Sequence, residues 1–278
     1  MKDLTQRTIT GLLFIIVVIA SILFNEYSFG ILFLFLTGLA LIEFHNLIES
    51  KLDVQVGVWV PAAAGMVLFV SMFIFAAGWI DYRVFALYFI VLCIVFISEL
   101  YRKKENPIMN WGIFTLGQAY IALPFSLLSV IAYIQGSYNS ILILAFFVII
   151  WINDSGAYLV GVTFGKHRLF ERISPKKSWE GFFGGLLFAL GAAFLFSRYE
   201  SILTLSQWFG FALIIVIFGT FGDLSESLLK RTLGVKDSGK IFPGHGGILD
   251  RFDSILFATI VISIYLQLLL YKLPEIPR

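Results

Sequence analysis

The chain is poor in charge and has almost no cysteine. Of its 278 residues, only 14% are Asp, Glu, Lys or Arg, whereas 59% are hydrophobic. A soluble domain is about one quarter charged, so this chain lacks the polar residues needed to cover a surface in water. Its single cysteine, Cys93, lies in an apolar run, where we interpret it as a packing residue. The composition therefore excludes a soluble domain and a disulfide-stabilised scaffold.

The sequence also lacks a signal-peptide cleavage site, an internal repeat and a strong net charge, and each absence makes one class of protein less favoured. No small-x-small cleavage site follows the first apolar stretch, so residues 1–24 predict a retained helix rather than a signal peptide. No internal repeat is evident, which removes the usual sequence support for an inverted-repeat transporter. The net charge of +2 gives no indication of nucleic acid, and we expect no nucleic-acid partner.

Long apolar runs, by contrast, are abundant. A membrane-spanning helix needs about 20 apolar residues. The candidate segments are 9–24, 28–48, 57–80, 82–100, 110–134, 139–164, 179–197, 207–230 and 250–272. We therefore predict an all-α polytopic integral membrane protein with about nine transmembrane helices. Only "NEYS" separates the first two, which predicts a tight hairpin or a re-entrant pair.

The basic residues are distributed unevenly between the two ends of these helices. With the N-terminus inside, most of the 20 Lys and Arg residues fall on the cytoplasmic side. The exceptions are Arg83, Arg198, Lys272 and Arg278. Because cytoplasmic loops carry an excess of Lys and Arg, we predict a protein of the cytoplasmic (plasma) membrane with its N-terminus and active site on the cytoplasmic side.

Polar segments interrupt the apolar pattern on this same side. They are "NDSGAY" at 153–158, the loop "FGKHRLFERISPKKSWEGFFGG" at 164–185, and "FGDLSESLLKR" at 221–231, which leads into "KDSGKIFPGHGGILDRFDS" at 236–254. Acidic residues within a membrane span are energetically unfavourable and usually mark a functional site. These segments are accordingly our candidates for a site.

The carboxylates in these segments come from separate helices. Asp154 shares a helical face with Tyr158, which also allows a simple helix-packing polar cluster. Asp250 and Asp253, three residues apart, lie on one face of the last helix, where the helix dipole alone would also favour acids. Hard oxygen ligands of this kind suit Mg²⁺, which commonly keeps one or two carboxylates and completes its shell with substrate phosphates.

Basic and glycine-rich segments accompany the acids. The glycines around His245 in "PGHGG" allow close approach of the backbone, whose N–H groups can form an anion-binding concavity. Lysines in "SPKKS" and near residue 236 would neutralise a polyphosphate. Metal-holding acids, phosphate-binding bases and such a turn are what phosphoryl or nucleotidyl transfer requires. The spacing alone predicts a membrane-embedded enzyme for phosphorylated substrates, without naming them.

The order of these residues resembles a known family signature. The run "SLLKR" at 227–231, "KD" at 236–237, "PGHGG" at 243–247 and "DRFD" at 250–253 is similar to that of phosphatidate cytidylyltransferases, also called CDP-diacylglycerol synthases. "NDSGAYLVGVTFGK" and "SPKKSWEGFFGG" also resemble that family, with Ser155 and Ser178 where threonine is expected. The resemblance is strong over 150–255, whereas residues 1–140 match only as apolar helices.

The resemblance implies the reaction CTP + phosphatidate → CDP-diacylglycerol + pyrophosphate. It further implies Mg²⁺, with a second cation left open, a setting among membrane lipids, and a homodimer. We expect residues 1–140 to form a lipid-facing and dimerisation region and residues 141–278 to form the catalytic membrane domain. The metal ligands that the family implies match Asp223 and Asp250, with Asp253 close by.

Individual roles follow from the same resemblance and from charge. The residues expected to act in catalysis are Asp223, Asp250, Lys230 and Arg231. Those expected to bind substrate are Asp154, Lys176, Lys177, Ser227, Lys236, Asp237, His245 and Arg251.

Two other functions are alternatives. A CTP-dependent polyprenol or phytol-type lipid kinase would share the acids and the basic loops, although the full 227–253 signature argues against it. An ion-coupled transporter could use Asp154, Asp223 and Glu226 as cation ligands. A transporter would place charged residues along both halves of the bilayer, whereas the outer half of this chain carries almost none.

Overall fold

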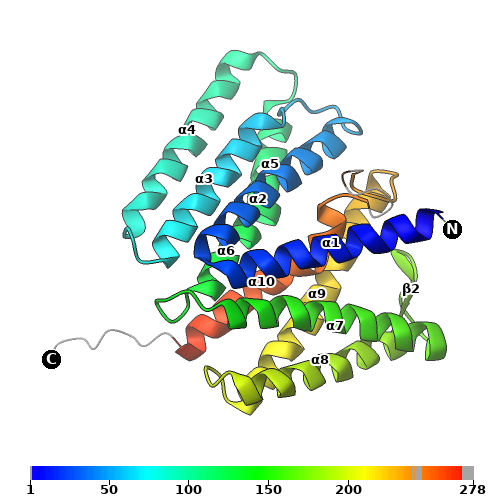
Figure 1. Ribbon diagram of the computed structural model, residues 1–278. Coiled ribbons are helices and arrows are strands. Elements are labelled where there is room, and N and C mark those ends of the chain that lie inside the picture. Colours follow the sequence, from blue (N-terminus) through cyan, green and yellow to red (C-terminus); the bar gives the residue numbers. More distant parts are fainter. Residues whose placement is uncertain (1, 240, 242–245, 271–278) are drawn as a thin grey trace.

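Helices packed side by side make up almost the whole structure (Figure 1), a computed structural model that describes residues 2–239, 241 and 246–270, with side chains from residue 9 onward. The elements are α1 (Lys2–Phe24), α2 (Glu26–Glu49), α3 (Trp59–Ala76), η1 (Tyr82–Val84), α4 (Phe85–Arg102), α5 (Pro107–Gly117), η2 (Gln118–Ala122), α6 (Leu123–Ala132), α7 (Ser140–Phe164), β1 (Arg168–Phe170), β2 (Ser174–Ser178), α8 (Trp179–Tyr199), α9 (Leu205–Thr232) and α10 (Leu249–Leu270). The all-α class is confirmed.

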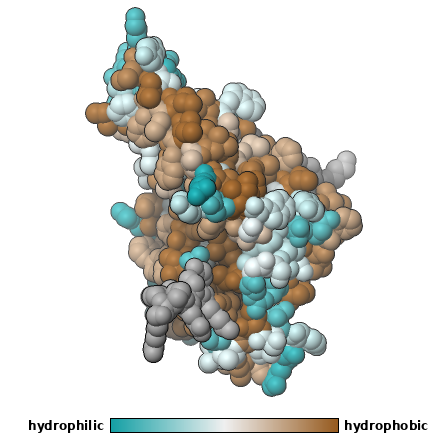
Figure 2. Space-filling view, turned by 90° about the vertical axis from the view of Figure 1, so that its left-hand side faces the viewer, coloured by the Kyte–Doolittle hydropathy of each residue, from teal (hydrophilic) through white to brown (hydrophobic). Residues whose placement is uncertain are grey.

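The helices correspond closely to the predicted apolar segments. In the described part of the chain, eight helices are long and apolar enough to cross a membrane, and a shorter apolar helix, Ile9–Phe24, precedes them. The surface is correspondingly apolar, and Figure 2 shows one face on which hydrophobic residues predominate. The chain is an integral membrane protein, while the number of its transmembrane helices stays a prediction.

Two local features refine the predicted segments. Asn25 alone connects α1 to α2, and its side chain accepts a hydrogen bond from the Ser28 N–H at 2.8 Å, which caps α2. The predicted segment 110–134 is not a uniform helix, because the π-helical turn η2 lies between α5 and α6. A π-helical turn inside an α-helix is rare, and where one occurs it is often at a functional site.

The helices share a continuous aromatic core. The ring of Phe252 in α10 lies 5.6 Å from Phe14 in α1, 6.3 Å from Phe33 in α2, 5.0 Å from Phe125 in α6 and 6.5 Å from Phe147 in α7. The N-terminal and C-terminal halves therefore pack against each other through α10. The division into residues 1–140 and 141–278 stays a prediction about their roles.

The polar loops gather at one end of the bundle. In Figure 1, the connections α2–α3 and α4–α5 lie toward the top and the β1–β2 hairpin and the end of α9 toward the right, whereas the connections α1–α2, α3–α4, α6–α7 and α8–α9 lie toward the left and the bottom. This is the alternation that successive membrane crossings produce. The end with the polar loops is the one whose basic residues predict a cytoplasmic position.

Helices α7 and α8 approach each other closely through glycines. A Cβ atom on Gly181 would lie 2.8 Å from the Ala157 carbonyl oxygen and 3.2 Å from the Gly161 Cα. This close packing holds β2 and the start of α8 beside the polar part of α7. The hairpin β1–β2, which connects α7 to α8, is antiparallel.

We expect Gly181→Ala to lower the thermal midpoint of the purified protein by several degrees. The added methyl group has to displace backbone atoms, and overpacking of this kind destabilises by about 1–3 kcal/mol. Gly191→Ala is the matched control on the same helix, because a Cβ there meets no atom within 4 Å. Equal midpoints for the two variants would contradict the close packing of α7 and α8.

Candidate active site

A cavity of about 940 Å³ lies between α1, α7, the β1–β2 hairpin, α8, α9 and α10 at the end of the bundle that carries the polar loops. Several predicted site residues line it: Asp154, Lys176, Lys177, Asp223, Asp250, Arg251 and Asp253. The sequence motifs at 153–158, 174–178 and 250–253 therefore contribute to a single space, although they are far apart in the chain. Asp223 and Asp250, the predicted metal ligands, lie at the same end of the molecule.

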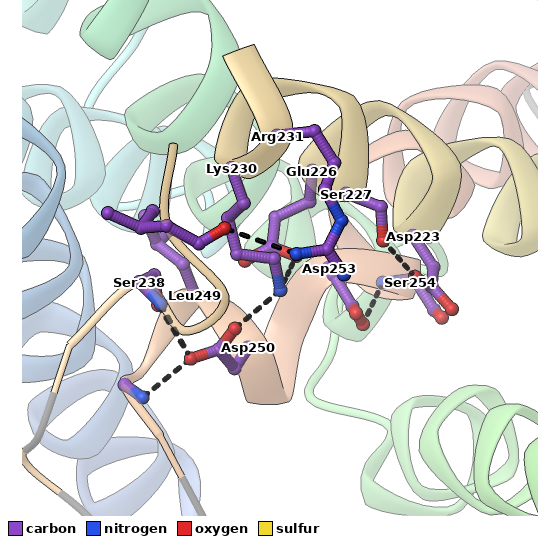
Figure 3. A network of polar contacts seen from close by, with 12 residues as sticks. Asp223, Glu226, Ser227, Lys230, Arg231, Ser238, Leu249, Asp250, Asp253 and Ser254 are labelled. Carbon is purple, nitrogen blue, oxygen red and sulfur yellow. Dashed lines mark hydrogen bonds and ion pairs between the residues drawn. The ribbon is translucent and has the colours of Figure 1, made fainter. Parts of the chain in front are cut away.

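The acids of the cavity come from three helices. Asp154 projects from α7, Asp223 from α9 and Asp253 from α10. The last two lie side by side because α9 and α10 meet at Gly222, where a Cβ atom would be 3.4 Å from the Asp253 carbonyl carbon. Figure 3 shows their side chains on the same side of the α9–α10 contact. The result is a concentration of negative charge on one wall.

Among Asp154, Asp223 and Asp253, Asp223 is the one that forms an ion pair with a described residue. Asp223 forms an ion pair with Lys177 of β2 and accepts a hydrogen bond from Ser227 Oγ at 3.2 Å. Asp253 accepts the backbone N–H of Ser254 at 2.6 Å, and no lysine or arginine among the described residues forms an ion pair with it. Asp154 accepts the Asn153 side-chain amide at 3.3 Å. The wall can thus accept further positive charge.

Asp250 is held by four donors (Figure 3). Its Oδ1 accepts from Lys230 Nζ at 2.6 Å, and its Oδ2 accepts from Ser238 N and Ser238 Oγ at 2.9 Å each and from Gly247 N at 2.8 Å. These bonds fix the orientation of the carboxylate at the cavity edge.

Lys230 lies between two carboxylates. Besides Asp250, its ammonium contacts Glu226, which is completely buried on α9. Lys230 is not among the residues that line the cavity. Its role at a substrate phosphate stays a prediction, and in the structure its ammonium holds the Asp250 carboxylate.

Other predicted residues lie outside the cavity lining. Arg231, Lys236 and Asp237 are exposed, and Arg231 donates to the Val235 carbonyl oxygen at 3.2 Å. Ser227 contacts Asp223 rather than the open space. His245 lies outside the described residues. The roles assigned to these residues stay predictions.

The sequence reasoning missed three residues of this region. Arg168 of β1 lines the cavity and adds positive charge to its lining. Ser238 holds Asp250, and Glu43 of α2 in turn accepts a hydrogen bond from Ser238. Glu43 could have been found as an acid within an otherwise apolar span. Nothing in the sequence connects it with residue 238.

The donor set fits a divalent cation. Asp223 and Asp253 offer hard carboxylate oxygens on one wall, as Mg²⁺ prefers. Within the described residues, no three His, Cys, Asp or Glu side chains are grouped closely enough to form a complete site. A cation here would therefore use one or two carboxylates and depend on substrate phosphates for the rest of its shell. Asp250 Oδ2 accepts three hydrogen bonds and Oδ1 only one, from Lys230 Nζ, so a cation would meet Asp250 through Oδ1, and its role as a ligand stays a prediction.

Comparison with known proteins supports the same family. The sequence model of the protein family described as "Cytidylyltransferase family" matches residues 5–269. A phosphatidate cytidylyltransferase of Bacillus subtilis (strain 168) is 36% identical over 265 residues, which cover 92% of this chain and 95% of that protein. One of Staphylococcus aureus (strain COL) is 36% identical over 267 residues, covering 94% and 98%.

These matches extend well beyond the motifs at 150–255, since they include most of the N-terminal half. The resemblance inferred from the signature residues is therefore confirmed. The chain belongs to the cytidylyltransferase family.

Proposed function

We propose that this protein transfers the cytidylyl group of CTP to phosphatidate, giving CDP-diacylglycerol and pyrophosphate. Family membership supports this reaction. The structural observation that carries it is the cavity in which acids from three helices face lysines and arginines of the β1–β2 hairpin and α10. Such a site can gather several phosphate groups within a membrane protein.

The residues can perform this chemistry without an activated side-chain nucleophile. The lipid phosphate is already an anion and attacks the α-phosphorus of CTP, so no Ser, Cys or His has to lose a proton. The main barrier is the approach of two anions and the charge on the departing pyrophosphate. Arg168, Lys176, Lys177 and Arg251 line the cavity and can neutralise that charge.

A divalent cation is the second part of the proposal. Asp223 and Asp253 would hold it, with Asp250 as the further ligand that the family resemblance implies. Mg²⁺ bound there would supply Lewis-acid stabilisation of phosphoryl oxygens. Lys177, which pairs with Asp223 in the structure, would then be free to turn toward a phosphate.

The walls of the cavity suit a substrate with two chemically different ends. Phe14 and Ile15 of α1, Val162 of α7 and Phe182 of α8 provide apolar surface beside the charged residues. Acyl chains can remain against this surface while the headgroup reaches the acids and bases. We place this site at the cytoplasmic side of the plasma membrane, in a protein that forms homodimers.

The fate of isotopic label in CTP tests the reaction. Purified protein is incubated with phosphatidate, Mg²⁺ and CTP labelled with ³²P at either the α or the γ position. We expect α-label in the lipid fraction and γ-label in pyrophosphate. A lipid kinase would instead place the γ-label in the lipid fraction and leave the α-label in CDP. Cation uptake into vesicles without CTP turnover would favour the transporter.

A further inference from the structure

Glu43 is a buried acid that the proposed chemistry does not use. It lies near the end of α2 with 5% of its surface exposed. Its Oε1 accepts hydrogen bonds from Ser238 Oγ at 2.5 Å and Leu249 N at 3.1 Å, and its Oε2 accepts from Ile248 N at 2.9 Å. A residue of the N-terminal half thus binds the segment that leads into α10.

Two of these contacts cap α10. The first N–H groups of a helix have no partner within the helix, and they carry a partial positive charge that favours an anion. Ile248 and Leu249 stand at this position, and Glu43 supplies the missing acceptor from 205 residues away. The start of α10 is therefore fixed by α2.

The segment around α10 is shaped to admit this carboxylate. A Cβ atom on Gly239 would lie 2.6 Å from the Glu43 Cδ, and one on Gly247 would overlap the same carboxylate. A side chain at either position would displace Glu43. The two glycines let the backbone pass on both sides of the acid.

Glu43 is only one contact away from Asp250. Ser238 Oγ lies 2.5 Å from Glu43 Oε1 and 2.9 Å from Asp250 Oδ2, and its single hydroxyl hydrogen is within reach of both. Ser238 N and Gly247 N, which hold Asp250, belong to the segment that Glu43 anchors. A shift of Glu43 would therefore move the donors that orient Asp250 (Figure 3).

We propose that Glu43 is a positioning residue for cytidylyl transfer. It acts through Ser238 and the start of α10, which hold the Asp250 carboxylate at the cavity edge. The proposal rests on the proposed function and gives the N-terminal half a part in the reaction. If Glu43 only stabilised the fold, its substitution would leave the kcat of the folded protein unchanged.

Glu43→Gln tests this role with little change in volume. The amide turns one acceptor into a donor that faces backbone N–H groups, so the contacts to Ile248 and Leu249 cannot all persist. The matched control is Glu99→Gln. Glu99 is equally buried, at 6% exposure, but its partners are Asn110 and Arg102, far from the signature.

Two measurements are made on each variant. Hydrogen–deuterium exchange of the peptide 246–250 reports on the amides of Ile248 and Leu249, and initial rates report kcat and the KM for CTP. We expect Glu43→Gln to accelerate exchange and to lower kcat about 10- to 100-fold, with KM changed less than threefold. Glu99→Gln should leave both the exchange of this peptide and kcat near wild-type values.

Ser238→Ala provides a second check. It removes the shared hydroxyl while Glu43 retains its two backbone contacts, so kcat should fall less than in Glu43→Gln. The two substitutions combined should lower kcat less than the product of their separate effects, because they interrupt the same path.

Three outcomes of these measurements distinguish a positioning role of Glu43 from a purely structural one and from failure of the proposed function. Faster exchange with an unchanged kcat would overturn the proposal and leave Glu43 as a structural cap. A lower kcat with unchanged exchange would also overturn it, because the effect would not pass through this segment. If wild-type protein transfers no cytidylyl group, the proposed function and with it the catalytic role of Glu43 fail, whereas the exchange rates still decide the contact itself.

Discussion

Replacing Asp223 by asparagine should reduce cytidylyl transfer by at least about 100-fold, the effect seen when one preorganised electrostatic group is removed from an active site. Asparagine keeps the shape of the side chain and removes its charge. Asp223 lines the cavity, pairs with Lys177 and lies beside Asp253. The loss should therefore appear in turnover at saturating CTP, measured over a range of Mg²⁺ concentrations, while insertion and yield remain normal.

Glu171→Gln is the matched control for this experiment. Glu171 is an exposed acid in the β1–β2 hairpin and is not among the residues lining the cavity, so its substitution should leave turnover unchanged. Asp250→Asn should resemble Asp223→Asn, since it removes the charge that faces Lys230. Near-normal turnover in Asp223→Asn would refute its assignment to the metal and to the reaction.

The sequence predicts the helices well because each needs only a local signal. An apolar run of sufficient length indicates a span whatever surrounds it, and the polar motifs within such runs are conspicuous for the same reason. Asp154, Asp223 and Asp253 are found in this way, and the structure brings them to one cavity. The α5–α6 interruption is not foreseen, because Gln118–Ala122 has no distinctive composition.

Pairings between distant residues are what the sequence leaves open. Glu43 accepts a hydrogen bond from Ile248 because α2 passes beside the start of α10. The residues next to Glu43 or Ile248 in the sequence do not specify that these two helices are neighbours. Lys230 shows a second limit. Its charge suits a substrate phosphate and a buried ion pair equally well, and only the positions of Glu226 and Asp250 distinguish the two.

Lys230→Met should destabilise the protein strongly. The ammonium lies between Glu226, which has no exposed surface, and Asp250. Removing one partner of a buried ion pair leaves a buried charge without compensation, an effect of about 3–5 kcal/mol. We expect a large fall in the thermal midpoint of the purified protein. Arg231→Met, at the exposed neighbouring position, should change stability by less than about 0.5 kcal/mol.

A second substitution separates buried charge from lost packing. Glu226→Met in the Lys230→Met background removes the uncompensated carboxylate together with its former partner, and replacing a whole buried ion pair by apolar side chains is often neutral for stability. Stability should therefore recover in part in the double variant, because Asp250 loses Lys230 but keeps its three other donors. Activity should not, because Asp250 has still lost the donor to its Oδ1. If the double variant were as unstable as Lys230→Met, the uncompensated charge of Glu226 would not be the cause of the instability.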